Sequence, residues 1–135
     1  MASYMLDTNV LIQIRAAHPQ VSRRFGVVKP GEAVMSVVSH GELLFGAEKS
    51  GARTKALALL DRIMADIPTL GVPPRAADDY ASIRLHLSSR GEIIGPNDLW
   101  IAAHARSAGL TLVTANEREF RRVPNLRVEN WASAT

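Results

Sequence analysis

Residues 4–9 read Tyr-Met-Leu-Asp-Thr-Asn, a short apolar run that passes directly into a polar triplet. The apolar part, Tyr4 to Leu6, has the length of a short buried strand. The triplet precedes a second apolar segment, Val10 to Arg15, which we expect to be a helix because Asp7 and Thr8 are both good helix-capping residues. The stretch therefore predicts a strand followed by a helix, with an acidic side chain where the strand ends.

The rest of the chain repeats this alternation of short strands and helices. Further strands are expected at 33–36, 67–70, 110–114 and 126–128, and further helices at 19–25, 38–48, 54–65, 74–90 and 96–108. Short strands that alternate with helices predict a parallel sheet covered on both faces. The expected fold is α/β, a three-layer α/β/α sandwich with a short, mostly parallel central sheet, and residues 1–135 are expected to form a single domain.

The composition fits a globular protein with a mildly basic surface. The chain is 47% hydrophobic, its formal net charge is +3, and most of its basic residues are arginine, which suits a polyanionic partner without proving one. The absence of cysteine excludes disulfides, thiolate nucleophiles and Cys-based metal sites. No run approaches the roughly 18 apolar residues that span a membrane, and no signal peptide is visible, so a cytoplasmic protein is expected.

Three carboxylates stand where the chain is otherwise apolar, and burial is expected for all of them. Asp7 ends the first strand, Glu42 lies on an apolar face of the helix at 38–48, and Asp98 begins the apolar helix after Pro96. A buried carboxylate without a partner is costly. Oxygen ligands favour hard divalent cations such as Mg²⁺ and Mn²⁺, which can activate water for phosphodiester hydrolysis. The three residues together therefore favour metal-dependent chemistry.

Each carboxylate also has a purely structural interpretation. Asp7 can cap the helix that follows it. With Pro96 at the first helical position, Asp98 is third in its helix, where the helix dipole favours a negative charge. Glutamate is rarely buried unpaired, and Glu42 can pair with an arginine in place of a metal.

The remaining chemical groups indicate less. None of the four histidines shows metal-ligand spacing, and His86 and His104 fit exposed or half-buried helix positions. The serines lie in no nucleophile motif. The tryptophans and phenylalanines are too scattered for a base-stacking surface and are expected in the core. The run Arg118 to Arg122, which contains Arg121-Arg122, lies soon after the strand at 110–114 and is either a solvated surface or a phosphate contact.

Four segments, taken in order, resemble PIN-domain ribonucleases of the VapC toxin type, and the likeness runs nearly end to end. They are residues 5–9, residues 36–50, residues 96–105 and residues 112–120, and residues 128–131 resemble the last strand of that family. Each segment alone is a weak signal, whereas four in the right order are specific. The resemblance implies a PIN-like fold and an endoribonuclease that is the toxin of a type II toxin–antitoxin system.

The resemblance also implies partners and site residues. The substrate would be structured RNA, such as tRNA, and the partners would be a VapB-type antitoxin and a second copy of the chain. Asp7, Glu42 and Asp98 would hold Mg²⁺ or Mn²⁺. The remaining implied site residues are Thr114 and Asn9, which would orient the site by hydrogen bonds, and Asn116, which stands where the family often has a fourth acid. Glu119, about one helical turn further on, can take the place of that acid.

Three alternatives compete with this interpretation. The first is a PIN-like RNA-processing nuclease that is not a toxin. The second is a haloacid-dehalogenase-like phosphatase, which also has an aspartate after its first strand but needs a second acid two residues later, where Asn9 stands here. The third is a non-enzymatic RNA- or protein-binding domain, which would have to explain Glu42 in another way.

Overall fold

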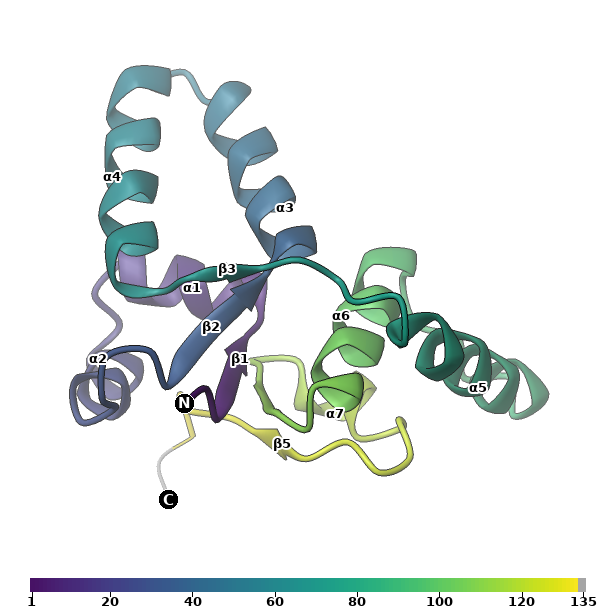
Figure 1. Ribbon diagram of the computed structural model, residues 1–135. Coiled ribbons are helices and arrows are strands. Elements are labelled where there is room, and N and C mark those ends of the chain that lie inside the picture. Colours follow the sequence, from purple (N-terminus) through teal and green to yellow (C-terminus); the bar gives the residue numbers. More distant parts are fainter. Residues whose placement is uncertain (134–135) are drawn as a thin grey trace.

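The computed structural model describes residues 1–133, which are built around a five-stranded sheet (Figure 1). Every pair of neighbouring strands is parallel, and the spatial order is β3-β2-β1-β4-β5. The strands are β1 (Tyr4–Leu6), β2 (Ala33–Ser36), β3 (Thr69–Leu70), β4 (Thr111–Val113) and β5 (Val128–Glu129). The predicted α/β class is confirmed, and the described sheet is wholly parallel where we expected it to be mostly so.

Helices join the strands and agree closely with those expected from the sequence. They are α1 (Thr8–Arg15), α2 (Pro19–Gly26), α3 (Val37–Glu48), α4 (Arg53–Asp66), α5 (Ala76–Ser89), α6 (Pro96–Ser107) and α7 (Glu117–Phe120). Of these, only the short α7 was not predicted. Within residues 1–133, none of the helices has the length and apolar character needed to cross a membrane.

Side chains that alternate along the strands bury both faces of the sheet. Met5 belongs to a core formed with α5, α6 and α7, whereas its neighbour Leu6 belongs to a second core formed with α1 to α4. The same alternation separates Leu112 from Val113 on β4. Figure 1 shows the two groups of helices on either side of the strands. This arrangement is the predicted α/β/α sandwich, and it follows from the two-residue period of a strand.

The order of the strands places a reversal point between β1 and β4. From β1 the chain proceeds outward to β2 and β3, and it then returns to the other side of β1 to form β4 and β5. The backbone amide of Asp7 donates a 2.8 Å hydrogen bond to the carbonyl of Val113, so the carboxyl ends of β1 and β4 lie side by side. In parallel sheets such a reversal point is where ligands bind.

Two residues lie in environments that differ from those expected. His104 is fully buried, and its Nδ1 is 2.8 Å from Oγ of Ser36, which links α6 to the end of β2. Burial lowers the pKa of His104, so the ring is neutral at pH 7. Phe45 was expected in the core but is 65% exposed. The reason is that α3 projects beyond the sheet, so its outer half is covered mainly by α4 (Figure 1).

Candidate active site

Asp7 follows β1 directly and is the most buried of the predicted acidic residues, with 3% of its surface exposed. It is the N-cap of α1, and its Oδ1 accepts a 2.8 Å hydrogen bond from the backbone amide of Thr8. Its Oδ2 accepts a 2.9 Å hydrogen bond from Oγ1 of Thr114, which follows β4. Burial raises the pKa of Asp7, and these two hydrogen bonds offset the rise only in part. Asp7 is therefore both a helix cap and a carboxylate under electrostatic strain.

Glu42 lies in the second turn of α3 and is half-buried, so the expected burial is only partly correct. Its two carboxylate oxygens are held separately. Oγ1 of Thr8 donates to Oε1 at 2.6 Å, and Nδ2 of Asn97 donates to Oε2 at 3.3 Å. Glu42 makes no salt bridge to any residue in 1–133, so the arginine partner considered from the sequence is not found there.

Asp98 is the third residue of α6, after the N-cap Gly95 and the first helical residue Pro96, as the sequence predicted. It too is half-buried, and its carboxylate accepts no hydrogen bond from residues 1–133. Burial raises the pKa of Asp98 to about 6, together with repulsion from the charges of Asp7, Glu42 and Glu119. These four carboxylates, which we call the acidic cluster, therefore share one electrostatic environment.

The segment after β4 supplies the remaining predicted residues. The backbone amide of Asn116 donates to Oγ1 of Thr114 at 2.9 Å, which orients the threonine hydroxyl toward Asp7. Nδ2 of Asn116, the N-cap of α7, donates to Oε2 of Glu119 at 2.8 Å. The side chain of Asn9 is exposed and makes no hydrogen bond within the described part of the chain. Asn116 thus positions Glu119, and Asn9 does not orient the cluster here.

Sequence reasoning missed two residues of the site, Thr8 and Asn97. Both hydrogen-bond to Glu42, and each is the immediate neighbour of a predicted acidic residue, Asp7 or Asp98. That adjacency was the available signal. This signal was not sufficient, because adjacency in the sequence does not reveal that α1 and α6 both approach Glu42 on α3.

The chemistry of the acidic cluster fits a divalent cation. Its donors are carboxylate oxygens, which hard cations prefer, and none of the four carboxylates forms a salt bridge among residues 1–133. Repulsion raises the pKa of Asp98, and a bound cation would relieve that repulsion. In the side-chain positions described for residues 1–133, no three Asp, Glu, His or Cys residues are arranged to hold one ion together. The fit is therefore one of charge and donor type.

Glu42 stands between two grooves that lie on either side of α3. One groove, with a volume of about 300 Å³, runs between α1, α3 and α4 and includes Thr8 together with Arg15 and Lys55. The other, of about 640 Å³, includes Phe45 and Asn97 and faces α6. Glu42 is therefore accessible to solvent from both grooves.

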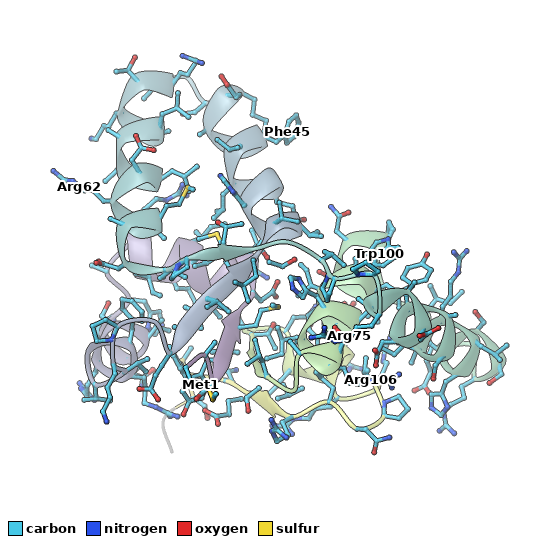
Figure 2. All side chains as sticks on the ribbon, in the orientation of Figure 1. Met1, Phe45, Arg62, Arg75, Trp100 and Arg106 are labelled. Atoms are coloured by element: carbon cyan, nitrogen blue, oxygen red, sulfur yellow. The ribbon has the colours of Figure 1, made fainter. Side chains whose placement is uncertain are left out.

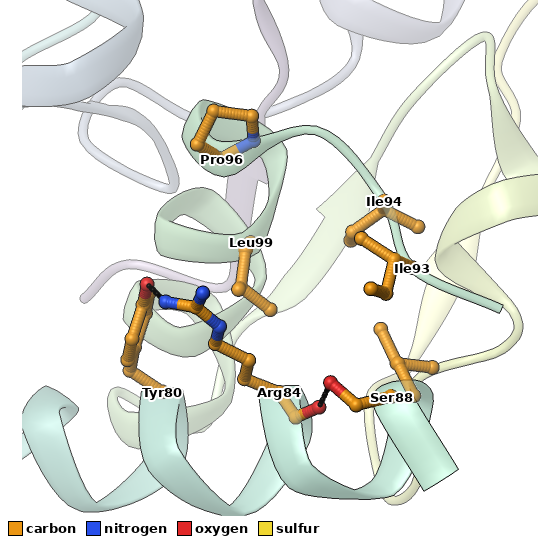
Figure 3. A pocket seen from close by; sticks show the side chains of 8 residues that line it. Tyr80, Arg84, Ser88, Ile93, Ile94, Pro96 and Leu99 are labelled. Atoms are coloured by element: carbon orange, nitrogen blue, oxygen red, sulfur yellow. Dashed lines mark hydrogen bonds between the residues drawn. The ribbon is translucent and has the colours of Figure 1, made fainter. Parts of the chain in front are cut away.

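A separate cavity of about 200 Å³ lies between α5 and α6 and the loop before α6 (Figure 3). Arg84 donates a 2.8 Å hydrogen bond to the hydroxyl of Tyr80 there, and the other walls are mostly apolar. None of the four carboxylates of the acidic cluster lines this cavity. It is therefore not part of the candidate active site.

Comparison with known proteins identifies close relatives along the whole chain. Residues 4–126 match the PIN domain family. The chain is 41% identical over 132 residues to Ribonuclease VapC2 of Haemophilus influenzae, which covers 97% of this chain and 99% of that one. It is 41% identical over 133 residues to the tRNA(fMet)-specific endonuclease VapC of Shigella flexneri, covering 98% and 100% of the two chains. It also superposes, with a TM-score of 0.91 and 37% identity, on a chain of the DNA-bound VapBC crystal structure from Salmonella typhimurium, covering 97% and 99% of the two chains.

Proposed function

Because the chain belongs to the PIN-domain family and is a ribonuclease toxin of the VapC type, we propose that it cleaves RNA at the acidic cluster. The family and the ribonuclease activity expected from the sequence are confirmed by the relatives. The same relationship sets aside the phosphatase, the binding module and the nuclease that is not a toxin. The residues that perform the cleavage are our proposal.

The observation that carries this proposal is a set of four mutually repelling carboxylates, none of which forms a salt bridge among residues 1–133. Burial and the charges of Asp7, Glu42 and Glu119 raise the pKa of Asp98. We infer that Asp7, Glu42 and Asp98 hold Mg²⁺ or Mn²⁺, with Glu119 as the fourth acidic residue. When bound, the cation supplies Lewis acidity, which makes water a better nucleophile at neutral pH and offsets charge on the phosphodiester. The carboxylates have to move closer together on binding, because no three of them are arranged as ligands without the ion.

The neighbouring side chains hold the carboxylates in place for this task. Thr114 fixes one oxygen of Asp7, and the backbone amide of Thr8 fixes the other. Thr8 and Asn97 similarly donate hydrogen bonds to the two oxygens of Glu42. Each oxygen accepts only one such hydrogen bond and so keeps a lone pair that is free to bind a cation. Asp98 accepts no such hydrogen bond in residues 1–133, so it is the carboxylate with the greatest freedom to turn toward a cation.

We propose that the substrate is structured RNA and that it is a tRNA. Support comes from the Shigella flexneri and Salmonella typhimurium relatives, which are named tRNA(fMet)-specific endonucleases. The excess of arginine over lysine and the formal net charge of +3 also suit a phosphate backbone.

We further propose that a small VapB-type antitoxin inhibits the enzyme and that the active protein is a homodimer. The solved relatives from Salmonella typhimurium and Rickettsia felis are VapBC complexes with bound DNA. In this chain the exposed apolar side chain of Ile12 lines the groove between α1, α3 and α4, and Glu42 of the acidic cluster lines the same groove. An antitoxin segment that places an arginine among the carboxylates would match both the apolar surface and the charge.

The test is cleavage of total cellular RNA by the purified protein, followed by sequencing of the new RNA ends. Cleavage should depend on Mg²⁺ or Mn²⁺ and should be absent with Asp98→Asn. The new ends should map to one position in one or a few tRNAs. Cleavage by wild type that persists in excess chelator, or an Asp98→Asn protein that still cuts, would contradict the proposed site.

A further inference from the structure

Phe45 is 65% exposed, whereas the other six Phe, Tyr and Trp side chains, all within the described range, are buried or only partly exposed. It stands on α3 three residues after Glu42, so the two side chains lie on neighbouring positions of one helix face. Figure 2 shows Phe45 projecting from α3 away from α4. Exposing this ring costs hydrophobic free energy, and packing within the chain does not explain it.

The ring shares its groove with part of the acidic cluster. Glu42, Phe45, Lys49 and Asn97 all line the groove of about 640 Å³ that faces α6. Nζ of Lys49 lies 4.9 Å from the centre of the Phe45 ring, and Lys49 has no salt-bridge partner among residues 1–133. An aromatic ring and a free ammonium group therefore lie beside the proposed cleavage site.

Two glycines keep the surface beside this ring bare. Gly41 and Gly46 lie inside α3 and line the same groove, and a Cβ atom added at either position would meet nothing within 4 Å. Glycine inside a helix is less stable than alanine, and neither position has a packing reason for it. Side chains in a helix lean toward its N-terminus, so the Phe45 ring lies over the turn that contains Gly41. The two glycines thus leave room for a flat group against the ring.

We propose that Phe45 and Lys49, with the bare surface at Gly41 and Gly46, form a stacking site for a nucleobase of the RNA substrate. This inference rests on the proposed location of cleavage at the acidic cluster. A base from an unpaired loop would stack on the Phe45 ring, and Lys49 would contact a phosphate of the same strand. Unpaired bases are recognised in this way because every base presents a flat π-face and carries a phosphate beside it.

A nucleobase explains the groove better than a protein segment does. A ribonuclease must hold a phosphodiester at the acidic cluster, so the nucleotides next to the scissile bond have to lie along the surfaces that border Glu42. Besides the apolar Val37 and Val38, the groove combines one aromatic ring with one cation that has no salt-bridge partner among residues 1–133, and these are the two elements of single-strand binding. A purely apolar protein contact would not require the cation.

The site can be tested by RNA binding without cleavage. The probe is a fluorescent single-stranded RNA of about ten nucleotides, a length suited to such grooves, and its binding to the full chain is followed by anisotropy in excess EDTA. Phe45→Ala should raise the dissociation constant roughly 5- to 150-fold, and Phe45→Trp should restore wild-type binding or improve it. Lys49→Gln should weaken binding and reduce its dependence on salt concentration.

Matched controls lie at the opposite end of the strands. Val27→Ala removes an exposed apolar side chain and Lys29→Gln an exposed cation, and both should bind the RNA as wild type does. Gly41→Ala should raise the melting temperature by about 2–4 °C while weakening RNA binding, a combination that a merely structural glycine would not produce.

Two results would overturn the stacking site. The first is wild-type RNA binding by Phe45→Ala and Lys49→Gln. The second is unchanged RNA binding by Phe45→Ala with loss of self-association or of antitoxin binding, which would assign the ring to a protein interface. Either result would be compatible with the proposed cleavage site, provided that cleavage still requires metal and Asp98. Failure of Asp98→Asn to abolish cleavage would instead refute the cleavage site.

Discussion

Oγ1 of Thr114 donates a 2.9 Å hydrogen bond to Oδ2 of Asp7, and the two residues are 107 positions apart in the sequence. Both side chains are buried, and they join the carboxyl ends of β1 and β4. Burial raises the pKa of Asp7, and this hydrogen bond is the largest of the effects that lower it. Thr114 therefore favours the ionised form of Asp7, which is the form that binds a cation.

Replacement of Thr114 by valine tests this role. The variant should be less stable by about 1–3 kcal/mol, because a buried carboxylate oxygen loses its donor. The pKa of Asp7 should rise, so RNA cleavage should fall and recover partly at higher pH. Urea denaturation and the pH profile of cleavage measure the two effects. Thr114→Ser, which keeps the hydroxyl, should restore both, and a valine variant with the wild-type pH profile would contradict the assignment.

Glu119 and Asn116 compete for the role of the fourth acidic residue, and the structure suggests an experiment that separates them. Asn116 donates to Glu119 and so acts through it. We expect Glu119→Gln to reduce cleavage more than Asn116→Ala does. Glu119→Gln should also lower the pKa of Asp98, because the Glu119 charge contributes to raising it. NMR titration of the Asp98 carboxyl and initial cleavage rates check both statements; equal rates for wild type and Glu119→Gln would remove Glu119 from the site.

The sequence was sufficient to predict the architecture and the position of Asp7 because both depend on local patterns. A three-residue apolar run ending in a helix cap indicates a strand end whatever surrounds it, and Met5 and Leu6 are indeed buried on opposite faces. The sequence could not reveal which helix faces are covered by neighbouring elements and which are left exposed. Phe45 is exposed because α3 extends past the sheet, and His104 is buried because α6 packs on the end of β2, and no residue within either helix specifies these neighbours.

The proposed antitoxin can be tested genetically and biochemically. A gene for a short protein should lie beside this one, and its product should relieve the toxicity of the chain on co-expression. Replacing one arginine of that product by alanine should abolish inhibition of RNA cleavage, because that arginine would pair with the acidic cluster. The measurement is cleavage of the same RNA with increasing amounts of each inhibitor. A chain that is harmless when expressed alone, and that copurifies with nothing, would contradict this proposal.

The raised pKa of Asp98 predicts how the stability of the metal-free protein depends on pH. Its pKa is about 6 in the folded protein and near the ordinary value of about 3.9 in the unfolded chain, so the folded state holds the proton more tightly. The favourable contribution of Asp98 to the free energy of unfolding is therefore fully present below about pH 4. This contribution is lost as the pH rises through 6. In EDTA, wild type should therefore melt below Asp98→Asn at pH 7 to 8, and the gap should close near pH 4. A gap that is constant with pH would show that Asp98 is not under this strain.

Asp98→Asn also distinguishes a cation ligand from a residue that only favours the start of a helix. As a helix-dipole residue, Asp98 would contribute about 0.3–1 kcal/mol, and its loss would leave cleavage intact. As a ligand, it is one of several repelling charges, so the metal-free variant should be at least as stable as wild type. Mg²⁺ at about ten times its Kd should stabilise wild type by roughly 1.4 kcal/mol, a rise of about 2–5 °C in Tm, and this rise should nearly vanish in the variant.

Asp78→Asn is the matched control for that experiment. Asp78 is also an acidic residue in the first turn of a helix, α5. Unlike Asp98, it is exposed and lies far in the sequence from the residues of the acidic cluster. The Asp78→Asn variant should lose a little stability, keep the Mg²⁺-dependent rise in Tm and cleave RNA at the wild-type rate. Asp98→Asn should cleave more slowly by orders of magnitude. Asp7→Asn should behave like Asp98→Asn, and the double variant should be little worse than either, since both residues act on one ion. If Asp98→Asn and Asp78→Asn give the same cleavage rate and the same response to Mg²⁺, Asp98 is a helix-terminus residue and the proposed metal site is wrong.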